Sequence, residues 1–197
     1  MSRSLALFAA LAACVVCPAQ VLQVRLGVHS TCPDGLPGCW GGPYQALCML
    51  KGITVEKKPD FQTWMVKATI ADDQFPDMAV IDKQVRAAGQ FFYVRGFEVT
   101  VQGAVKRVGG KMMIAVPGCK DMVQLVQAKK SHEWNPIEKE ERPLRPDEQE
   151  AFTKLSGAFT AGQPMVVVGW LDQAPDKTLS IEVIGSGPAP KPAPKSR

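Results

Sequence analysis

The order of hydrophobic patterns over residues 20–101 restricts the fold of this chain more than any other feature. Apolar residues alternate with polar ones over residues 22–28, which is the period of a strand with one buried face. A loop rich in Gly and Pro comes next, and apolar residues then recur at helical spacing until Gly52, which ends the helix. The apolar positions of this first helix are Tyr44, Leu47, Cys48 and Leu50.

The next segment adds two strands, a second helix and a long strand. The two strands are expected within residues 53–70, on either side of a turn at Pro59-Asp60. The second helix is expected over residues 76–89, where Met78, Ile81, Val85 and Ala88 form one apolar face. A strand-like run follows over residues 91–105. The resulting order, β-α-β-β-α-β, is that of the ferredoxin-like sandwich, and we predict this fold for residues 20–101.

Beyond residue 101 the pattern becomes mainly β. Strand patterns occupy residues 99–105, 111–116, 122–127, 165–171 and 179–184. A helix pattern over residues 148–159 interrupts them, and residues 129–146 have the polar, Pro-containing composition of a loop. Short strands with one late helix are typical of an OB-like barrel, so we predict an α+β chain with this barrel at residues 102–184. No linker separates the two parts, and one strand is therefore expected to run from the first into the second.

The two ends of the chain differ in composition from the rest. Arg3, the apolar residues 5–16 and the small residues before Gln20 predict a signal peptide over residues 1–19, with cleavage after Ala19. The alternative is a lipoprotein signal, in which Cys14 becomes the lipidated first residue. Both alternatives predict a periplasmic or secreted protein, in a compartment that permits disulfides. The Pro, Ala and Lys residues of 185–197 predict a disordered tail.

Charge and residue spacing argue against several function classes. The formal net charge is only +4, and Lys191, Lys195 and Arg197 lie in the tail, so a nucleic-acid surface is not expected. No apolar run is long enough to span a bilayer, which leaves a lipid on Cys14 as the predicted route to a membrane. No catalytic triad spacing or phosphate-binding glycine loop is present, and the chain has only 2 His, so an enzyme is not predicted.

The cysteines Cys32 and Cys39 are the clearest candidates for metal binding or thiol chemistry. They lie in the loop between the first strand and the first helix, where the helix N-terminus would favour thiolate over thiol. Two thiolates bind soft metal ions, so we expect Cu(I), Hg(II) or Zn(II), with His29 as a third ligand. A disulfide between the two cysteines, or a redox switch, is the alternative. Cys48 is expected to be a small core residue.

The first helix and the second helix together resemble those of the heavy-metal-associated domain family, which includes copper chaperones and mercury-scavenging periplasmic proteins. In the first helix, Cys39 stands at the opening position, followed by Ala46-Leu47 and by Gly52-Ile53 at the helix end. In the second helix, Ala88-Gly89 precedes an aromatic residue. The resemblance covers residues 20–101 and implies capture of a soft metal ion by loop thiols. Six residues separate Cys32 from Cys39, where the family has two.

These observations lead to two hypotheses from different classes. The first is an exported heavy-metal-binding protein that transfers or sequesters copper or mercury. The second is a disulfide-stapled module of the cell envelope, whose barrel binds a protein or a polysaccharide and which holds no metal. Two smaller expectations concern charged residues: Asp72 and Asp73 cap the second helix, and the charged run 138–142 is a solvated loop.

Overall fold

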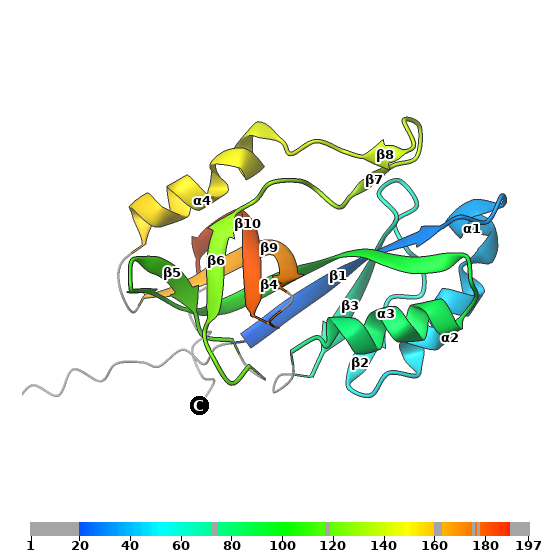
Figure 1. Cartoon of the computed structure of the whole chain (residues 1–197), viewed down its shortest axis with the longest axis horizontal. Helices are drawn as coiled ribbons and strands as arrows, with labels where there is room; N and C mark the ends of the chain where they lie inside the picture. The colour runs from blue at the N-terminus through cyan, green and yellow to red at the C-terminus, as the bar shows by residue number, and fades with distance from the viewer. Residues whose placement is uncertain are drawn as a thin grey trace, which may run out of the picture.

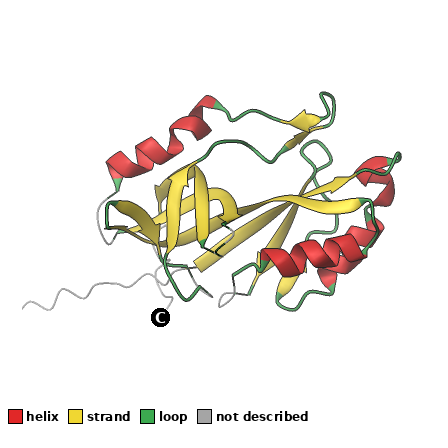
Figure 2. Cartoon of the chain, viewed as in Figure 1, coloured by secondary structure: helices red, strands yellow, loops and turns green. Residues whose placement is uncertain are grey.

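The computed structural model describes residues 20–71, 75–116, 119–159, 163–174, 176 and 178–189. The chain is of the α+β type, with one mixed sheet of eight strands in the order β2-β3-β1-β4-β5-β6-β10-β9 (Figures 1 and 2). The predicted signal peptide, the lipidation site Cys14, Asp72, Asp73 and residues 190–197 lie outside the described residues. No helix in the described ranges has the length and apolar character that crossing a membrane requires.

Most predicted elements are present, with small differences at their ends. The strands are β1 (Gln20–Ser30), β2 (Ile53–Val55), β3 (Met65–Ile70), β4 (Phe92–Val108), β5 (Lys111–Ile114), β6 (Val123–Gln127), β7 (Trp134–Asn135), β8 (Glu140–Glu141), β9 (Pro164–Gln173) and β10 (Leu179–Pro188). The helices are α1 (Gly35–Cys39), α2 (Gly41–Cys48), α3 (Met78–Ala87) and α4 (Pro146–Ala158).

The N-terminal strands form one end of the sheet. β1 lies between β3 and β4 and is antiparallel to both, and β2 is antiparallel to β3. Helices α2 and α3 lie side by side on one face of these strands (Figure 1). Leu47 of α2 and Ile81 and Val85 of α3 are buried there. The predicted apolar face of the second helix therefore packs on the sheet.

Strand β4 belongs to both parts of the chain. It is 17 residues long, pairs with β1 over Phe92–Gln102 and pairs with β9 over 97–104. Its last residues pair with β5. The boundary expected at residue 101 therefore falls inside a strand that two sets of neighbours share.

The C-terminal strands close into a ring. β4 pairs with β5, β5 with β6, β6 with β10, β10 with β9, and β9 returns to β4. The β6–β10 pair is parallel, and the other pairs are antiparallel. Helix α4 packs against β6 and β10. Val99, Leu125, Leu155 and Ile181 are almost fully buried here, and they belong to the same hydrophobic cluster as the core under α2 and α3.

The first predicted helix differs from expectation, because it is divided in two. The short helix α1 ends at Cys39, and α2 begins at Gly41, where Pro43 occupies a first-turn position that tolerates its missing N–H. Cys39 therefore ends a helix and does not open one. Ala46 and Leu47 are buried while Cys48 is exposed, so the expectation that Cys48 is a core residue is wrong.

Three further expectations need correction. The region 129–146 is not a plain solvated loop, because β7 and β8 form a hairpin within it and Arg142 lies in part-buried ion pairs. The predicted tail begins too early, because residues 185–188 continue β10 and pair with β9. Helix α3 begins at Met78 and is capped by Asp77, whose carboxylate accepts a hydrogen bond from the Val80 amide.

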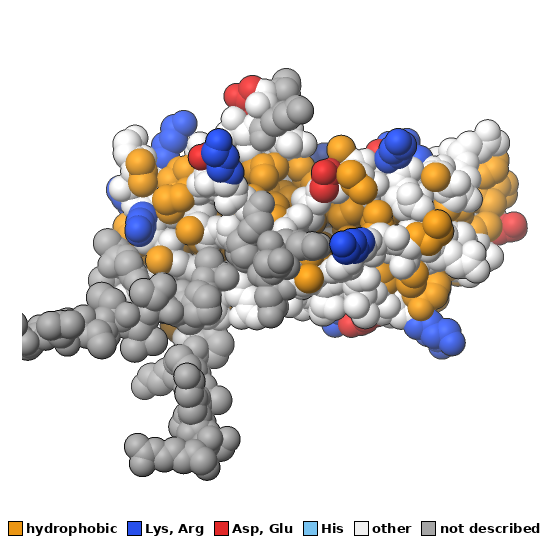
Figure 3. All heavy atoms as spheres, turned by 90° about the horizontal axis from the view of Figure 1, so that it is seen from below, with side chains coloured by type: hydrophobic (Ala, Val, Ile, Leu, Met, Phe, Trp, Pro, Cys, Tyr) orange, Lys and Arg blue, Asp and Glu red, His pale blue; other side chains and the backbone are white. Residues whose placement is uncertain are grey.

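The surface of the chain carries scattered charge on the face shown in Figure 3. There the Lys and Arg side chains stand apart from one another, with hydrophobic and uncharged polar groups between them. The most exposed large hydrophobic residues of the described ranges are Met49 and Ile137.

Candidate metal-binding site

The loop that follows β1 folds back on itself and brings Cys32 next to Cys39. The Cys32 amide donates to the Ser30 hydroxyl at 3.1 Å, and the Cys32 carbonyl accepts from the Gly35 amide at 2.9 Å. Gly35 has a φ of +66°, a left-handed conformation that glycine adopts without steric cost. The single turn of α1 then places the Cys39 sulfur 3.5 Å from the Cys32 sulfur, and both thiols are free. The local backbone conformation of the loop therefore brings the two sulfurs together, although six residues separate the cysteines in the sequence.

A carboxylate joins the two sulfurs. The ligand atoms of Cys32, Asp34 and Cys39 all lie within 4.8 Å of one another. Both cysteines are half-buried and Asp34 is exposed, so the group opens to solvent on the carboxylate side. Two sulfurs and one oxygen are donors that a zinc ion accepts. Asp34 was not a candidate from the sequence, because an acidic residue between two cysteines has no distinguishing spacing.

The protonation of Cys39 differs from the sequence expectation. The hydrogen bond with Cys32, together with burial and the negative charge of Asp34, raises the pKa of the Cys39 thiol. Cys39 lies at the last residue of α1, and the C-terminal end of a helix carries partial negative charge. Cys39 also lies directly before Trp40, the N-cap of α2, so the two helix ends beside it act on the thiolate in opposite senses. A metal ion would have to displace a proton from Cys39, which makes binding dependent on pH.

His29, the third predicted ligand, is not part of this group. Its ring lies 4.4 Å from that of Trp134, 5.1 Å from that of Tyr93 and 5.2 Å from that of Trp64. The residue is buried, and its Nδ1 atom has no hydrogen-bond partner within the described ranges. Burial, together with the charge of Arg95, lowers the pKa of His29, so the ring is neutral at neutral pH. The structure thus places His29 in an aromatic cluster.

Trp64 connects this aromatic cluster with the cysteine loop. A side chain at Gly35 would meet the far edge of the Trp64 indole at 3.8 Å, so the indole forms a wall of the loop. Trp64 has a φ of +51°, which is rare for a bulky residue. It also stacks on Trp134, with ring centres 6.0 Å apart. Trp64 lies within the range 53–70 where the sequence predicts two strands, but it directly precedes β3, and no local pattern indicates its contacts.

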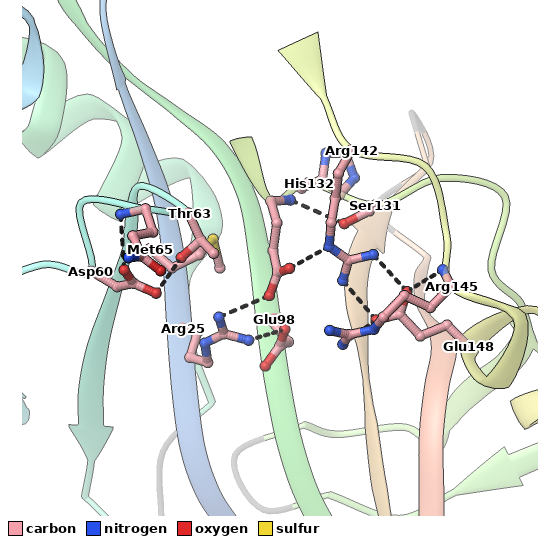
Figure 4. A network of polar contacts seen from close by, with 12 residues as sticks. Arg25, Asp60, Thr63, Met65, Glu98, Ser131, His132, Arg142, Arg145 and Glu148 are labelled. Atoms are coloured by element: carbon pink, nitrogen blue, oxygen red, sulfur yellow. Dashed lines mark hydrogen bonds and ion pairs between the residues drawn. The ribbon is translucent and has the colours of Figure 1, made fainter. Parts of the chain in front are cut away.

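A network of buried ion pairs, which the sequence analysis did not predict, holds the segment between β6 and α4 in place. We call residues 128–145 the strap. Arg25 of β1 pairs with Glu98 of β4 at 2.7 Å and with Glu133 of the strap at 2.9 Å. Arg142 of the strap pairs with Glu133 and, at 2.7 Å, with Glu148 of α4 (Figure 4). This network ties the strap to strand β1 and to helix α4.

The network stabilises the carboxylates of Glu133 and Glu148 in the charged form, but not that of Glu98, whose pKa burial raises. Burial opposes the ionisation of Glu133 and Glu148, but the hydrogen bonds from Arg142 outweigh it and lower the pKa of both carboxyls. The Glu148 side chain is only 2% exposed, and that of Glu133 is 9% exposed. Buried carboxylates of this kind require their partners.

Comparisons with protein-family models, with curated proteins and with solved structures find no match for this chain.

The stability of the chain should decrease as the pH falls below about 6.5. Burial lowers the pKa of His29 and of His132, so the unfolded chain takes up protons at these rings before the folded chain does. Each ring therefore reduces the free energy of unfolding as the pH falls from 6.5 to its folded pKa. Urea denaturation at pH 7.5, 6.5 and 5.5 measures this slope, and the variant His29→Phe should show a smaller one.

Glu98 provides the control for this pH dependence. Burial raises the pKa of Glu98, so its protonation acts in the opposite sense and stabilises the folded chain as the pH falls. The variant Glu98→Gln should therefore steepen the loss of stability toward acid. Equal slopes for the parent chain and His29→Phe would contradict the role assigned to the buried histidine.

Proposed function

We propose that this chain binds a metal ion through the thiolates of Cys32 and Cys39 and the carboxylate of Asp34. The observation that carries the proposal is the convergence of these three ligand atoms within 4.8 Å. The half-buried sulfurs and the exposed carboxylate leave one side of the group open to solvent. An open side permits a further ligand, either water or a donor from a partner that receives the ion.

The distance between the sulfurs favours four-coordinate geometry. With Zn–S bonds of about 2.3 Å, a tetrahedral ion holds two sulfurs about 3.8 Å apart, whereas a linear ion with such bonds holds them about 4.6 Å apart. The 3.5 Å between the two free, hydrogen-bonded thiols would need only a small opening to reach the tetrahedral value, and a larger one to reach the linear value. A carboxylate oxygen is also a better ligand for Zn(II) than for Cu(I). We therefore place Zn(II) before Cu(I) and Hg(II) as the bound ion.

The architecture behind the site is proposed to combine a ferredoxin-like part of heavy-metal-associated type with an OB-like barrel. The order β2-β3-β1-β4, with helices between β1 and β2 and between β3 and β4, supports the first assignment. The closed ring of β4, β5, β6, β10 and β9, with α4 between β6 and β9, supports the second. In this proposal the site lies in the first part, and the shared strand β4 holds the barrel rigidly beside it.

The proposed setting is outside the cytoplasm. The pattern of residues 1–19 supports export, either as a free protein or as a lipoprotein anchored through Cys14. Transfer of the ion to a partner, or its sequestration, is the proposed role, and no catalytic activity is assigned.

Titration calorimetry of the reduced protein with Zn(II), and separately with Cu(I), tests the proposal. The variant Cys39→Ser should lower the Zn(II) affinity more than about 100-fold, because outer-shell changes alone cost 10–100-fold. Asp34→Asn should have a smaller effect, since both sulfurs remain. Cys48→Ser is the matched control, because this thiol is exposed and lies outside the group. Absence of binding, or equal loss in Cys39→Ser and Cys48→Ser, would reject the site.

A disulfide-stapled interaction module is the second candidate function. The 3.5 Å between two free sulfurs is close enough that a small approach would permit a bond of about 2.05 Å. In this alternative the loop is a staple, and the barrel binds an envelope protein or a polysaccharide. The intact mass of the native protein, measured before and after reduction and alkylation, distinguishes the two candidates. A native protein that resists alkylation at Cys32 and Cys39 until it is reduced would favour the staple.

A further inference from the structure

The cysteine loop lies at the end of the molecule away from the closed ring of strands (Figure 1). Among the residues of α1 only Leu36 is buried, so a single side chain anchors this short helix in the hydrophobic cluster. Cys32 and Cys39 are half-buried, and Asp34 between them is exposed. A small molecule in solution can therefore approach the two sulfurs from the side of the carboxylate.

The packing of the loop keeps its ligand atoms together in the absence of an ion. A Cβ atom at Gly38 would lie 3.0 Å from the Cβ atom of Asp34, so glycine at this position allows the turn to close on Asp34. A Cβ atom at Gly35 would lie 3.6 Å from the ring of Pro37. These contacts lie within the loop itself, and the sulfurs stay side by side without a metal.

The separation of the sulfurs lies between the values of two chemical states. It is 3.5 Å, whereas a disulfide bond is about 2.05 Å long and a tetrahedral ion holds two sulfurs about 3.8 Å apart. A modest movement of the loop reaches either state. The two states exclude each other, because a sulfur in a disulfide is no longer the thiolate that a metal ion requires.

The bond would change the chemistry of the site more than the stability of the fold. It would close only residues 32–39, and the loop entropy that a disulfide removes from the unfolded chain falls as the loop shortens. The hydrophobic cluster extends through both parts of the chain and does not rely on this loop for its closure. A bond of this kind is suited to control a site.

We propose that oxidation of Cys32 and Cys39 to a disulfide releases the metal ion, so that the site is a switch controlled by thiol oxidation. The inference rests on the proposed function, because it concerns the same ligands. It also joins the two candidate functions, since the metal site and the staple become the reduced and the oxidised state of one loop. The proposed setting outside the cytoplasm is one in which disulfides form.

The oxidant in this proposal is the disulfide of a small thiol, RSSR. One cysteine thiolate attacks a sulfur of RSSR, a mixed disulfide forms, and RS⁻ leaves. The thiolate of the other cysteine attacks the cysteine sulfur of the mixed disulfide, and the second RS⁻ leaves. The cysteines have then given two electrons to the oxidant, and the carboxylate of Asp34 is the one remaining ligand of the group. The ion is released into solution.

A redox titration of the full-length protein tests the proposal. The protein is equilibrated with reduced and oxidised glutathione, either with EDTA or with free Zn(II) fixed by a chelator. Alkylation and peptide mass spectrometry measure the fraction of Cys32 and Cys39 in the disulfide. With EDTA, the two cysteines should oxidise together. With Zn(II), each tenfold increase in free ion above its dissociation constant should raise the midpoint by about 30 mV, because the ion binds the reduced form alone.

Variants separate the ion from the disulfide. Asp34→Asn should form the disulfide with EDTA as the parent chain does, but should need more free Zn(II) for the same shift of the midpoint, because the carboxylate takes part in ion binding alone. Cys39→Ser should form no bond within the chain at Cys32. Cys48→Ser is the matched control and should titrate as the parent chain does, since this thiol is exposed and lies outside the group.

The outcomes distinguish this inference from the proposed function. Zn(II) binding in calorimetry, together with a midpoint that does not respond to Zn(II) or with no bond between Cys32 and Cys39, would overturn the switch and leave the metal site in place. A native disulfide that reduced glutathione does not open would be a permanent staple and would also overturn the switch. Absence of Zn(II) binding to the reduced protein would overturn both proposals.

Discussion

Replacement of Arg142 by Met should destabilise the folded chain by about 3 kcal/mol. The guanidinium of Arg142 is the shared partner of Glu133 and Glu148, whose side chains are 9% and 2% exposed. Removal of one partner of a buried ion pair leaves a charge in a medium that solvates it poorly, which costs about 3–5 kcal/mol. The lower end of this range applies, because Arg25 still reaches Glu133 and Arg145 still reaches Glu148.

Urea denaturation at pH 7 measures this effect. Lys154→Met is the matched control, because Lys154 and Glu150 form an ion pair with both side chains more than 60% exposed, and such pairs contribute about 0–1 kcal/mol. Adding Glu148→Gln to Arg142→Met should recover part of the loss, since it removes a buried carboxylate that has lost one of its two arginine partners. A loss no larger than that of the control would mean that the strap does not depend on this network.

Replacement of Gly169 by Ala should also destabilise the chain, by about 3 kcal/mol. Gly169 of β9 faces Val183 of β10 and Val99 of β4 across the sheet. A Cβ atom there would collide with the Ile181 side chain and would lie 2.5 Å from the Glu182 carbonyl oxygen. Backbone atoms of a paired strand cannot move away alone, so the strands must separate. Overpacking of this kind costs about 1–3 kcal/mol, and the backbone clash places it at the upper end.

Gly157→Ala is the comparison for this variant. Gly157 lies in α4, and a Cβ atom there would meet nothing within 4 Å. Alanine in an open helical position should stabilise the chain by about 0.5–1 kcal/mol relative to glycine. Thermal and urea denaturation of the two variants should therefore change in opposite directions. A Gly169→Ala variant as stable as the parent chain would contradict the close packing of β9 on β10.

Much of the secondary structure could be predicted because it follows from local periodicity. Val24, Leu26 and Val28 alternate along β1 and are buried, and Ile81 and Val85 recur at helical spacing and are buried in α3. The helical pattern around Tyr44 was less reliable, because spacing alone did not show that the helix is broken at Trp40. Because of that break, Cys39 is the last residue of α1 and not the first residue of the predicted helix.

The candidate site was predicted in part. Cys32 and Cys39 could be paired because a loop with Gly and Pro can turn sharply, and the structure brings their sulfurs together. His29 could not be excluded from the sequence, because its neighbours Trp64, Tyr93 and Trp134 come from three separate segments. The raised pKa of Cys39 could not be predicted from the sequence either, since it depends on the hydrogen bond with Cys32, on burial and on the position of Asp34.

By itself, the sequence determined most of the strands and helices, because each pattern needs only residues a few positions apart. It did not determine the β7–β8 hairpin or the division of the first helix. The absence of a linker also predicted that one strand runs through both parts, and β4 is that strand. Only the tertiary structure decided which strands pair with β4, and that the strap returns across them. Arg25 meets Glu98 at a separation of 73 residues and Glu133 at 108. Such pairs depend on strand register and on the path of a long connection, and no local pattern of side chains carries that information.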